Sequence, residues 1–119
     1  MDKEFKKISA RFFKTKSGNE PVREWLLSLP REAKKKIGEA IATTEYGWPI
    51  GMPTCRNLGD DLNEVRTNVS DKWARVIFFV KDNYMILLHG FMKKTNKTPQ
   101  QDIKLAKKRK SEFLQGEKK

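Results

Sequence analysis

The stretch that decides the fold spans residues 84–98 and reads YMILLHGFMKKTNKT. Its first five residues form a continuous apolar run of strand length, which is typical of a strand covered on both faces. His89, Gly90 and lysines at positions 93, 94 and 97 follow this run. Gly90 is expected to allow the close approach of another backbone. Because a buried strand fixes the place of the residues behind it, these cations are expected to hold an anion such as phosphate.

Two more strands are predicted directly before this one. They cover residues 61–69 and 72–81, and the third strand covers residues 84–92. The links at Ser70-Asp71 and Asp82-Asn83 are short, so the three strands are expected to form an antiparallel meander.

The N-terminal half is predicted to add one strand and two helices. Residues 4–14 alternate Ile8, Ala10 and Phe12 with polar neighbours, the pattern of a half-exposed strand.

The first of the two helices is expected to contain Pro21 in its first turn, with Asn19 or Ser17 as its cap. The second is expected to run from Pro30 to about Tyr46.

The segments around the meander complete the predicted order. Residues 48–59 hold two prolines and two glycines, so an irregular connector is expected there. Thr98 is predicted to cap a last helix, with Pro99 at its first position and Gln101 at a capping-box spacing. One face of this helix is apolar, and its other face is expected to stay in solvent. The basic residues of that other face are Lys104, Lys107, Lys108, Arg109 and Lys110.

These elements predict a single α+β domain over residues 1–119. An N-terminal strand and two helices come first, an antiparallel three-stranded meander completes one sheet, and a C-terminal helix follows.

The composition favours an anionic partner. The chain has 26 Lys and Arg against 15 Asp and Glu, a formal net charge of +11. This imbalance favours nucleic acid or an anionic membrane surface. The membrane is the weaker alternative, because no apolar stretch approaches a bilayer span and the N-terminus lacks a signal-peptide core. We therefore expect no membrane association.

Cysteine and histidine are too few for two kinds of site. One cysteine excludes an internal disulfide, which fits a reducing cytoplasm, and one histidine leaves too few ligands for a Cys/His zinc site. We expect neither a metal nor a cofactor.

Hairpin geometry predicts a row of charges across the meander. Any even-length loop centred on Ser70-Asp71 places Arg66 opposite Arg75, and a three-residue loop at 81–83 places Arg75 opposite His89. A two-residue turn would instead place Gly90 opposite Arg75 and turn His89 to the other face. Like charges that face each other destabilise a sheet by about 0.2–1 kcal/mol. The row is therefore expected to hold an anion, or to be neutralised by Glu64.

Each of these residues also has an ordinary structural interpretation. Arg66 and Arg75 are ordinary sheet residues in that view, although Arg75 lies within the apolar run WARVIFFV, where burial without a partner is costly. Glu64 is as well explained by a salt bridge as by a catalytic base. His89 is better explained as a hydrogen-bonded core histidine than as a catalyst. Trp73 is most simply a core residue, with a base-stacking face as the alternative.

The lysines after the last strand also allow two interpretations. Lys93, Lys94 and Lys97 form a solubilising loop in one, and contact phosphate in the other. One of Lys93 and Lys94 shares the face of Arg75 in either register. Their position at the exit of a strand favours phosphate contact.

The sequence resembles the RelE/ParE toxin superfamily, and in particular its phage-derived, HigB-like branch. The resemblance is carried by the order of the elements and by four segments: EPVREWLLSLP, GWPIGMPTCRNLGDDLNEVR, ARVIFFV and LLHGFMKKTNKTP. It implies a RelE-like fold and a toxin of a type II toxin–antitoxin system. Members with ribonuclease activity cleave mRNA on the translating ribosome.

The resemblance also implies roles and partners. Arg66 matches the basic residue of the family's E-L-R-like motif, Arg75 the arginine of the second meander strand, and Lys93 and Lys94 the basic pair after the last strand. The family's motif has an aromatic residue where this chain has Asn63. The implied partners are mRNA on the ribosome and an antitoxin. HigB-type antitoxins usually carry a helix-turn-helix domain, which would associate the pair with DNA indirectly.

Cleavage of RNA through attack by a 2′-hydroxyl needs a base, cations on the phosphate oxygens and an acid. Arg66 and Arg75 fit the cationic role and Glu64 the base. The candidate acid is a lysine of the 93–97 loop, Lys93 first, or His89. Lys94, Lys97 and His89 are candidate phosphate contacts. Two alternatives remain: a ParE-like toxin that poisons gyrase, and a non-catalytic RNA- or ribosome-binding module.

Overall fold

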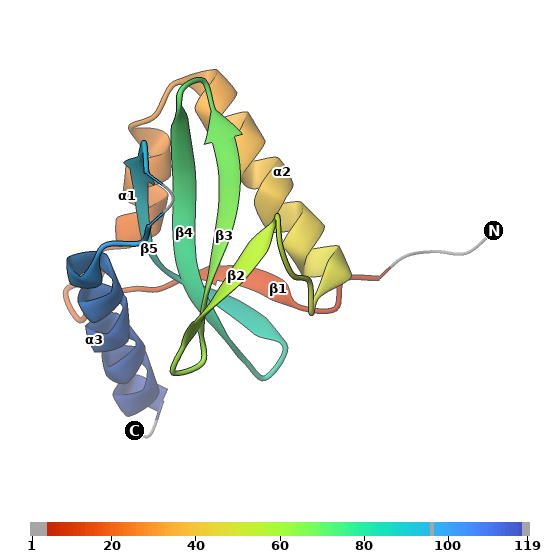
Figure 1. Cartoon of the computed structure of the whole chain (residues 1–119). Coiled ribbons are helices and arrows are strands. Elements are labelled where there is room, and N and C mark those ends of the chain that lie inside the picture. The colour runs from red at the N-terminus through yellow and green to blue at the C-terminus, as the bar shows by residue number, and fades with distance from the viewer. Residues whose placement is uncertain (1–4, 96, 118–119) are drawn as a thin grey trace.

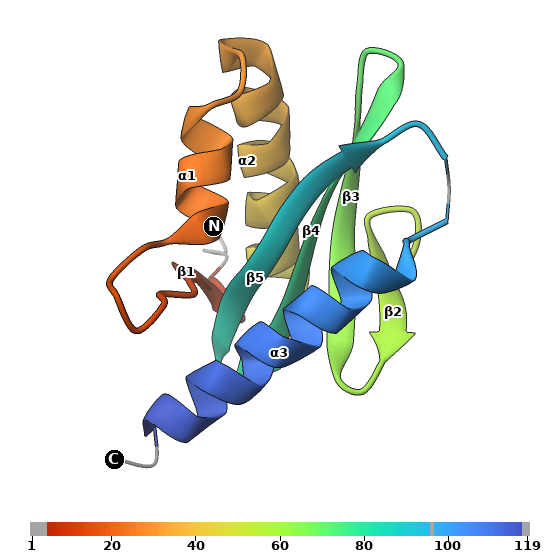
Figure 2. The same ribbon diagram turned by 90° about the vertical axis from the view of Figure 1, so that its left-hand side faces the viewer.

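The computed structural model describes residues 5–95 and 97–117, which form three layers (Figures 1 and 2). A five-stranded sheet with the order β1-β5-β4-β3-β2 lies between helices α1 and α2 on one face and helix α3 on the other. The strands are β1 (Ser9–Phe12), β2 (Cys55–Gly59), β3 (Leu62–Val69), β4 (Lys72–Lys81) and β5 (Tyr84–Lys93). The helices are α1 (Pro21–Leu27), α2 (Arg31–Gly47) and α3 (Gln100–Glu117). The α+β class is as predicted.

The sequence of the central strand β4 is apolar at consecutive positions because both faces of this strand are covered. Val76 and Phe78 face the cluster beneath α1 and α2, whereas Ile77 and Phe79 face the cluster beneath α3. Successive side chains of a strand point to opposite faces, so a strand covered on both sides is apolar throughout. The run 84–88 of β5 is buried in the same way from Met85 to Leu88.

The predicted strands 61–69, 72–81 and 84–92 correspond to β3, β4 and β5, which pair in antiparallel fashion. Asp82 and Asn83 form a two-residue turn with φ angles of 51° and 67°. Positive φ at both central positions suits the right-handed twist of a hairpin. The predicted three-residue loop at 81–83 is therefore wrong.

The prediction that the meander completes the sheet is incomplete, because a fifth strand lies within the predicted connector. Strand β2 pairs antiparallel with β3 and places Arg56 opposite Glu64. The prolines of the connector, at positions 49 and 53, both precede β2. The remaining residues are free of proline and can therefore pair.

Strand β1 lies at the sheet edge, parallel to β5. It is shorter than predicted, and Phe12 is exposed whereas Phe13 is buried in the cluster beneath α3. The C-terminal part of α2 meets β1 through Glu45. The carboxylate of Glu45 accepts a hydrogen bond from the backbone N–H of Ala10 at 2.7 Å, and its main-chain carbonyl accepts one from Lys7 at 2.8 Å.

Helix α1 packs closely on β5 at Gly90. A Cβ atom at Gly90 would lie 2.3 Å from Cε3 of Trp25. The close approach expected at this glycine is therefore made by an indole ring and not by another backbone. The predicted cap of α1 is wrong: the N-cap is Glu20, and Asn19 instead donates its backbone N–H to Thr15.

No helix within the described residues is both long enough and apolar enough to cross a membrane.

Candidate functional site

Three arginines and one glutamate converge on the α3 side of the sheet. The register places Arg66 of β3 opposite Arg75 of β4, as predicted, and Arg56 of β2 opposite Glu64 of β3. Because side chains alternate along a strand, Glu64 and Arg66 share a face, and their cross-strand partners share it too. We call these four residues the arginine cluster.

The centre of the cluster is a buried polar network. Glu64 and Arg75 both have 0% of their surface exposed. The hydroxyl of Thr98 donates a hydrogen bond to Oε2 of Glu64 at 2.7 Å and accepts one from Nη1 of Arg75 at 3.4 Å. Arg75 also donates to the backbone carbonyl of Thr95. These hydrogen bonds join the segment between β5 and α3 to the charged residues of the sheet.

Arg66 lies between this network and the surface. Its Nε atom is 3.7 Å from Oε1 of Glu64, and its guanidinium group lies 5.1 Å from the ring centre of Trp73. Arg66 retains 9% exposure, and Arg56 is exposed. Trp73 therefore supports an arginine here, which is a third role beside the two expected for it.

The charges of the cluster act on one another. Burial lowers the pKa of Arg75, the negative charge of Glu64 opposes this shift, and the positive charges of Arg66 and Arg56 add to it. Arg75 nevertheless keeps its proton at neutral pH, because a guanidinium group is not deprotonated in proteins. The cluster thus concentrates more positive than negative charge, which is the arrangement that attracts an anion.

Sequence reasoning missed Arg56, because it lies in the segment predicted to be irregular. An available signal was the proline-free stretch CRNL, which places Cys55 in one hydrophobic cluster and Leu58 against the other. The prediction of Thr98 as a helix cap missed its role in the network, because its hydroxyl is bonded to Glu64 and Arg75.

His89 lies on the α3 side of the sheet but not opposite Arg75. Arg75 faces Phe91, and His89 faces Ile77, because the register shifts between Ile77 and Phe78. Such a bulge turns a side chain to a new direction. The bulge places His89 on the α3 side, whereas a two-residue turn without a bulge would place it on the opposite face of the sheet.

The imidazole of His89 is held by α3. Its Nε2 atom lies 2.6 Å from Oδ1 of Asp102, and its ring stacks on Phe91 with 5.2 Å between ring centres. This geometry agrees with the interpretation of His89 as a hydrogen-bonded core histidine.

The lysines after β5 have different surroundings. Lys93 is half-buried and faces Trp73, so it shares the face of Arg75. Lys94 is exposed and lies 3.5 Å from a carboxylate oxygen of Asp71. Lys97 is exposed. Of the predicted lysine set, Lys93 is thus placed nearest in register to the arginine cluster.

The predicted solvent-exposed basic face of α3 is only partly free. Lys107 pairs with Asp60 at 2.7 Å, and Lys110 donates to the backbone carbonyl of Asp60 at 2.7 Å. Arg109 donates to the carbonyl of Leu88 at 2.9 Å. These contacts fasten α3 to the β2–β3 turn and to β5, while Lys104 and Lys108 remain exposed.

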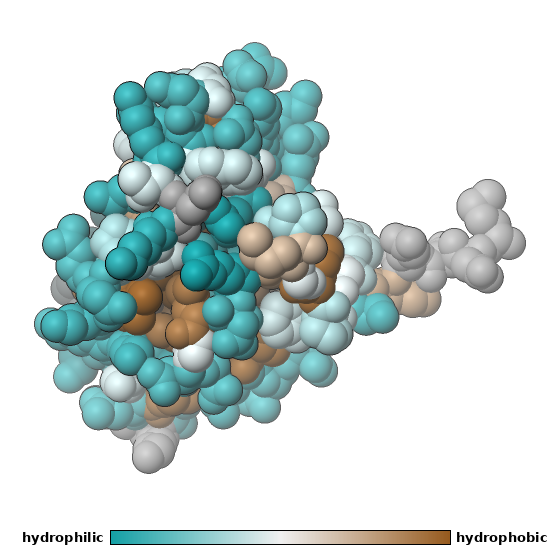
Figure 3. Space-filling view, in the orientation of Figure 1, coloured by the Kyte–Doolittle hydropathy of each residue, from teal (hydrophilic) through white to brown (hydrophobic). Residues whose placement is uncertain are grey.

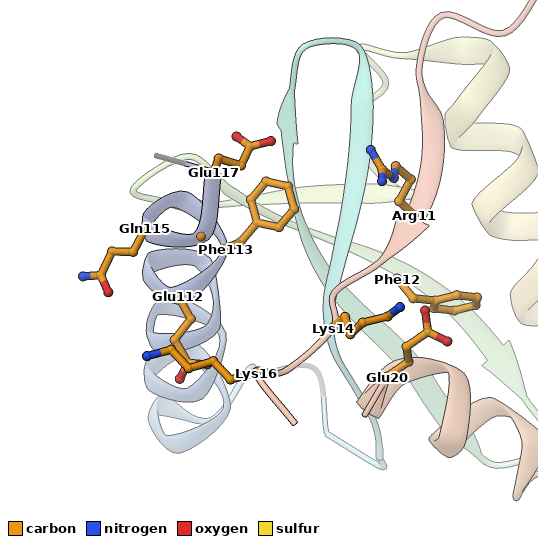
Figure 4. Close-up of a pocket in the computed structure, with 10 residues that line it drawn as sticks. Arg11, Phe12, Lys14, Lys16, Glu20, Glu112, Phe113, Gln115 and Glu117 are labelled. Atoms are coloured by element: carbon orange, nitrogen blue, oxygen red, sulfur yellow. The ribbon is translucent and has the colours of Figure 1, made fainter. Parts of the chain in front are cut away.

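One hollow lies away from the arginine cluster. Its volume is about 610 Å³, and it separates the C-terminal end of α3 from β1 and the start of α1 (Figure 4). Phe113 points from α3 toward the strands there (Figure 4). Arg11, Lys14, Glu20 and Glu117 also line it, so both signs of charge are present. No residue of the arginine cluster lines this hollow.

The face of the molecule that Figure 3 shows is mostly hydrophilic, with several separate hydrophobic areas. Among the described residues, no group of three or more His, Cys, Asp and Glu side chains is placed to hold a metal ion.

The fold and the arginine cluster together define a small α+β protein with an arginine-rich sheet face.

The comparison with protein families agrees with this class. Residues 24–111 match the model of the family described as "Phage derived protein Gp49-like (DUF891)". The chain belongs to this family, which is a RelE/HigB-like toxin family. No curated protein gave a significant match.

Proposed function

We propose that this protein is the toxin of a type II toxin–antitoxin system, of the HigB-like branch, and that it cleaves mRNA on the translating ribosome. The observation that carries the proposal is the arginine cluster, in which Arg56, Arg66 and Arg75 come from three neighbouring strands around one buried carboxylate. Family membership supports the toxin role and the existence of an antitoxin.

The exposures divide the cationic role among the arginines. Arg56 is exposed and Arg66 keeps 9% exposure, so we assign these two to the non-bridging oxygens of the scissile phosphate. Arg75 is fully buried and contributes its charge from beneath them. Preorganised cations of this kind are usually the largest single contribution to such a reaction. The guanidinium fork also suits phosphate better than an ammonium group does.

The proton transfers are assigned to the nearest groups of the same face. Glu64 remains the proposed base: its Oε1 atom, which is buried and accepts no hydrogen bond from the described residues, is proposed to take the proton of a 2′-hydroxyl while Oε2 stays bonded to Thr98. Lys93 is the proposed acid for the 5′-oxygen, because His89 is already bonded to Asp102.

Lys94 and Lys97 are proposed to contact flanking phosphates. The ion pair of Lys94 with Asp71 joins two exposed side chains, and such pairs contribute at most about 1 kcal/mol. RNA is therefore expected to displace Asp71 readily.

The antitoxin is proposed to be a HigA-like protein with a helix-turn-helix domain, which would bring the toxin to DNA indirectly. Its inhibitory segment is expected to carry Asp and Glu side chains that meet the arginine cluster.

The decisive experiment incubates the purified protein with mRNA and translating ribosomes, and in parallel with supercoiled DNA and gyrase. We expect ribosome-dependent cleavage of the mRNA and no effect on gyrase. Arg66→Ala and Arg75→Ala are each expected to slow cleavage about a hundredfold, the loss of one transition-state charge contact of about 3 kcal/mol. Arg23→Ala, on the exposed side of α1, is the matched control. Gyrase-dependent DNA breaks, or full activity of Arg66→Ala, would reject the proposal.

Arg75→Lys separates charge from geometry. Lysine keeps the positive charge but loses the fork that reaches both Thr98 and Thr95. We expect cleavage to remain well below the wild-type rate, and full activity would show that charge alone suffices.

A further inference from the structure

Thr98 occupies a junction between the sheet and α3. It precedes Pro99 at the entrance to α3, and only 7% of its surface is exposed. Its hydroxyl donates to Glu64 at 2.7 Å and accepts from Arg75 at 3.4 Å. A hydroxyl has one proton to donate, so this proton is committed to the carboxylate.

Besides Thr98, the side chain of Arg75 bonds to the backbone carbonyl of Thr95. Oε1 of Glu64 and Nε of Arg75 are buried and form no hydrogen bond within the described part of the chain. The carboxylate of Glu64 is also the group that Arg66 approaches at 3.7 Å. A single hydroxyl therefore acts on the buried arginine directly and on the more exposed arginine through the carboxylate.

We propose that Thr98 is a positioning residue for the cleavage reaction: its hydroxyl fixes the orientation of Glu64 and Arg75 and, through Glu64, that of Arg66. This inference rests on the proposed function. Thr98 itself touches neither the phosphate nor the reacting atoms. Overall attraction for RNA comes from exposed cations such as Arg56 and Lys97 and does not depend on Thr98.

The proposal predicts a separation between the two kinetic constants. Thr98→Val keeps the shape of the side chain and removes the hydroxyl, so kcat for ribosome-dependent cleavage is expected to fall about 10- to 100-fold while KM changes less than about twofold. Thr98→Ser restores the hydroxyl and is expected to recover kcat to within about threefold of wild type. Thr43→Val makes the same chemical change on the exposed side of α2 and is the control that leaves both constants unchanged.

Thr98→Ala provides a second variant without the hydroxyl, in case valine beside two buried charges prevents folding. Urea unfolding of every variant identifies those that are folded under the assay conditions. A folded Thr98→Val or Thr98→Ala enzyme with wild-type kcat overturns the inference. A Thr98→Ser enzyme as slow as Thr98→Ala also overturns it, because the hydroxyl would then not be the active feature.

A direct readout of Arg75 keeps this inference separate from the proposed function. NMR signals of the Arg75 guanidinium N–H groups are expected to exchange slowly in the wild type and to broaden or disappear in folded Thr98→Ala. Absence of cleavage by the wild type would overturn the proposed function and the kinetic part of this inference. Unchanged Arg75 signals in Thr98→Ala would overturn the positioning role itself, whether or not the wild type cleaves RNA.

Discussion

Glu64 shows how one residue organises a charged site. Its carboxylate is fully buried, accepts the hydroxyl of Thr98 and faces the guanidinium of Arg66. Without a negative charge at this position, the surrounding arginines would repel one another in a region where water cannot screen them. Glu64 therefore has a structural role in addition to the catalytic one proposed for it.

Replacement of Glu64 by glutamine is expected to destabilise the fold. Glutamine keeps an acceptor for Thr98 but leaves the buried charge of Arg75 without its counter-ion, and loss of one partner of a buried pair costs about 3–5 kcal/mol. Urea unfolding measures the free energy of unfolding. Glu39→Gln, on the exposed side of α2, is the control and is expected to change this free energy by less than about 0.5 kcal/mol. Equal stabilities of the two variants would contradict the counter-ion role.

At this scale the sequence predicted some residues of the site and missed others. Glu64, Arg66 and Arg75 stand in strands with clear alternation, so their shared face followed from hairpin geometry. Arg56 was missed because prolines and glycines around it obscured a five-residue strand. Thr98 was misread because its spacing to Gln101 matches a capping box, and spacing alone does not show which acceptor a hydroxyl chooses.

Among the elements, β5 meets layers on both sides. On one face the bulge after Leu87 presents His89 to Asp102 of α3. On the other, Gly90 receives the ring of Trp25 from α1. The sequence predicted the strand but not the bulge, because a single inserted residue leaves the apolar run unchanged. His89 lies on the face that the three-residue loop predicted. The bulge and not the loop places it there, and it lies opposite Ile77 instead of Arg75.

Gly90→Ala is expected to destabilise the packing of α1 on β5. The added Cβ would lie 2.3 Å from Trp25, and overpacking of this kind costs about 1–3 kcal/mol. Gly38→Ala is the matched control, because no atom lies within 4 Å of its new Cβ. Alanine inside a helix is more favourable than glycine by about 0.5–1 kcal/mol, so this control is expected to be stabilising. Thermal unfolding of both variants tests the opposite signs.

The contact between α3 and the β2–β3 turn is expected to depend on pH. The hydrogen bond and the charge of Lys107 lower the pKa of Asp60 from its ordinary value of 3.8. A carboxyl group whose pKa is lower in the folded state contributes stability above its unfolded pKa and loses it as pH falls through the folded one. The Asp60–Lys107 contact is thus fully present at neutral pH and weakens only below about pH 3.8.

Carboxyl NMR titration of Asp60 measures this shift directly. Lys107→Ala is expected to raise the pKa of Asp60 toward its ordinary value, whereas Lys104→Ala, on the exposed part of the same helix, serves as the control. An unchanged titration of Asp60 in Lys107→Ala would show that the two side chains do not interact in solution.

For the whole molecule, the net charge of +11 sets how partners approach. The antitoxin is expected to associate faster at low salt, because opposite charges attract over a distance that added ions shorten. Its final affinity is expected to depend more on apolar contacts, so dissociation rates should vary less with salt. Stopped-flow association across a series of salt concentrations measures both rates. A salt-independent association rate, or a complex that leaves Arg66, Arg75 and Lys93 accessible, would require a different mode of inhibition.

The overall order of elements was predictable because hydrophobic periodicity and turn residues agree along most of the chain. The position of β1 was not, because the parallel pairing of β1 with β5 joins segments about 75 residues apart, and no local pattern specifies such a contact. The same reason explains why the hollow between β1 and α3 was not anticipated.

The contact of Glu45 with β1 has a consequence for the protein at high concentration. An edge strand normally offers its free N–H and C=O groups to any other chain, which is a common route to self-association and fibre formation. Here a carboxylate from α2 already accepts the outward N–H of Ala10, and the main chain of Glu45 accepts those of Lys7 and Ile8. A strand from a second copy would have to displace this acidic side chain first. Helix α2 therefore also protects the β1 edge of the sheet from pairing with a second copy of the chain.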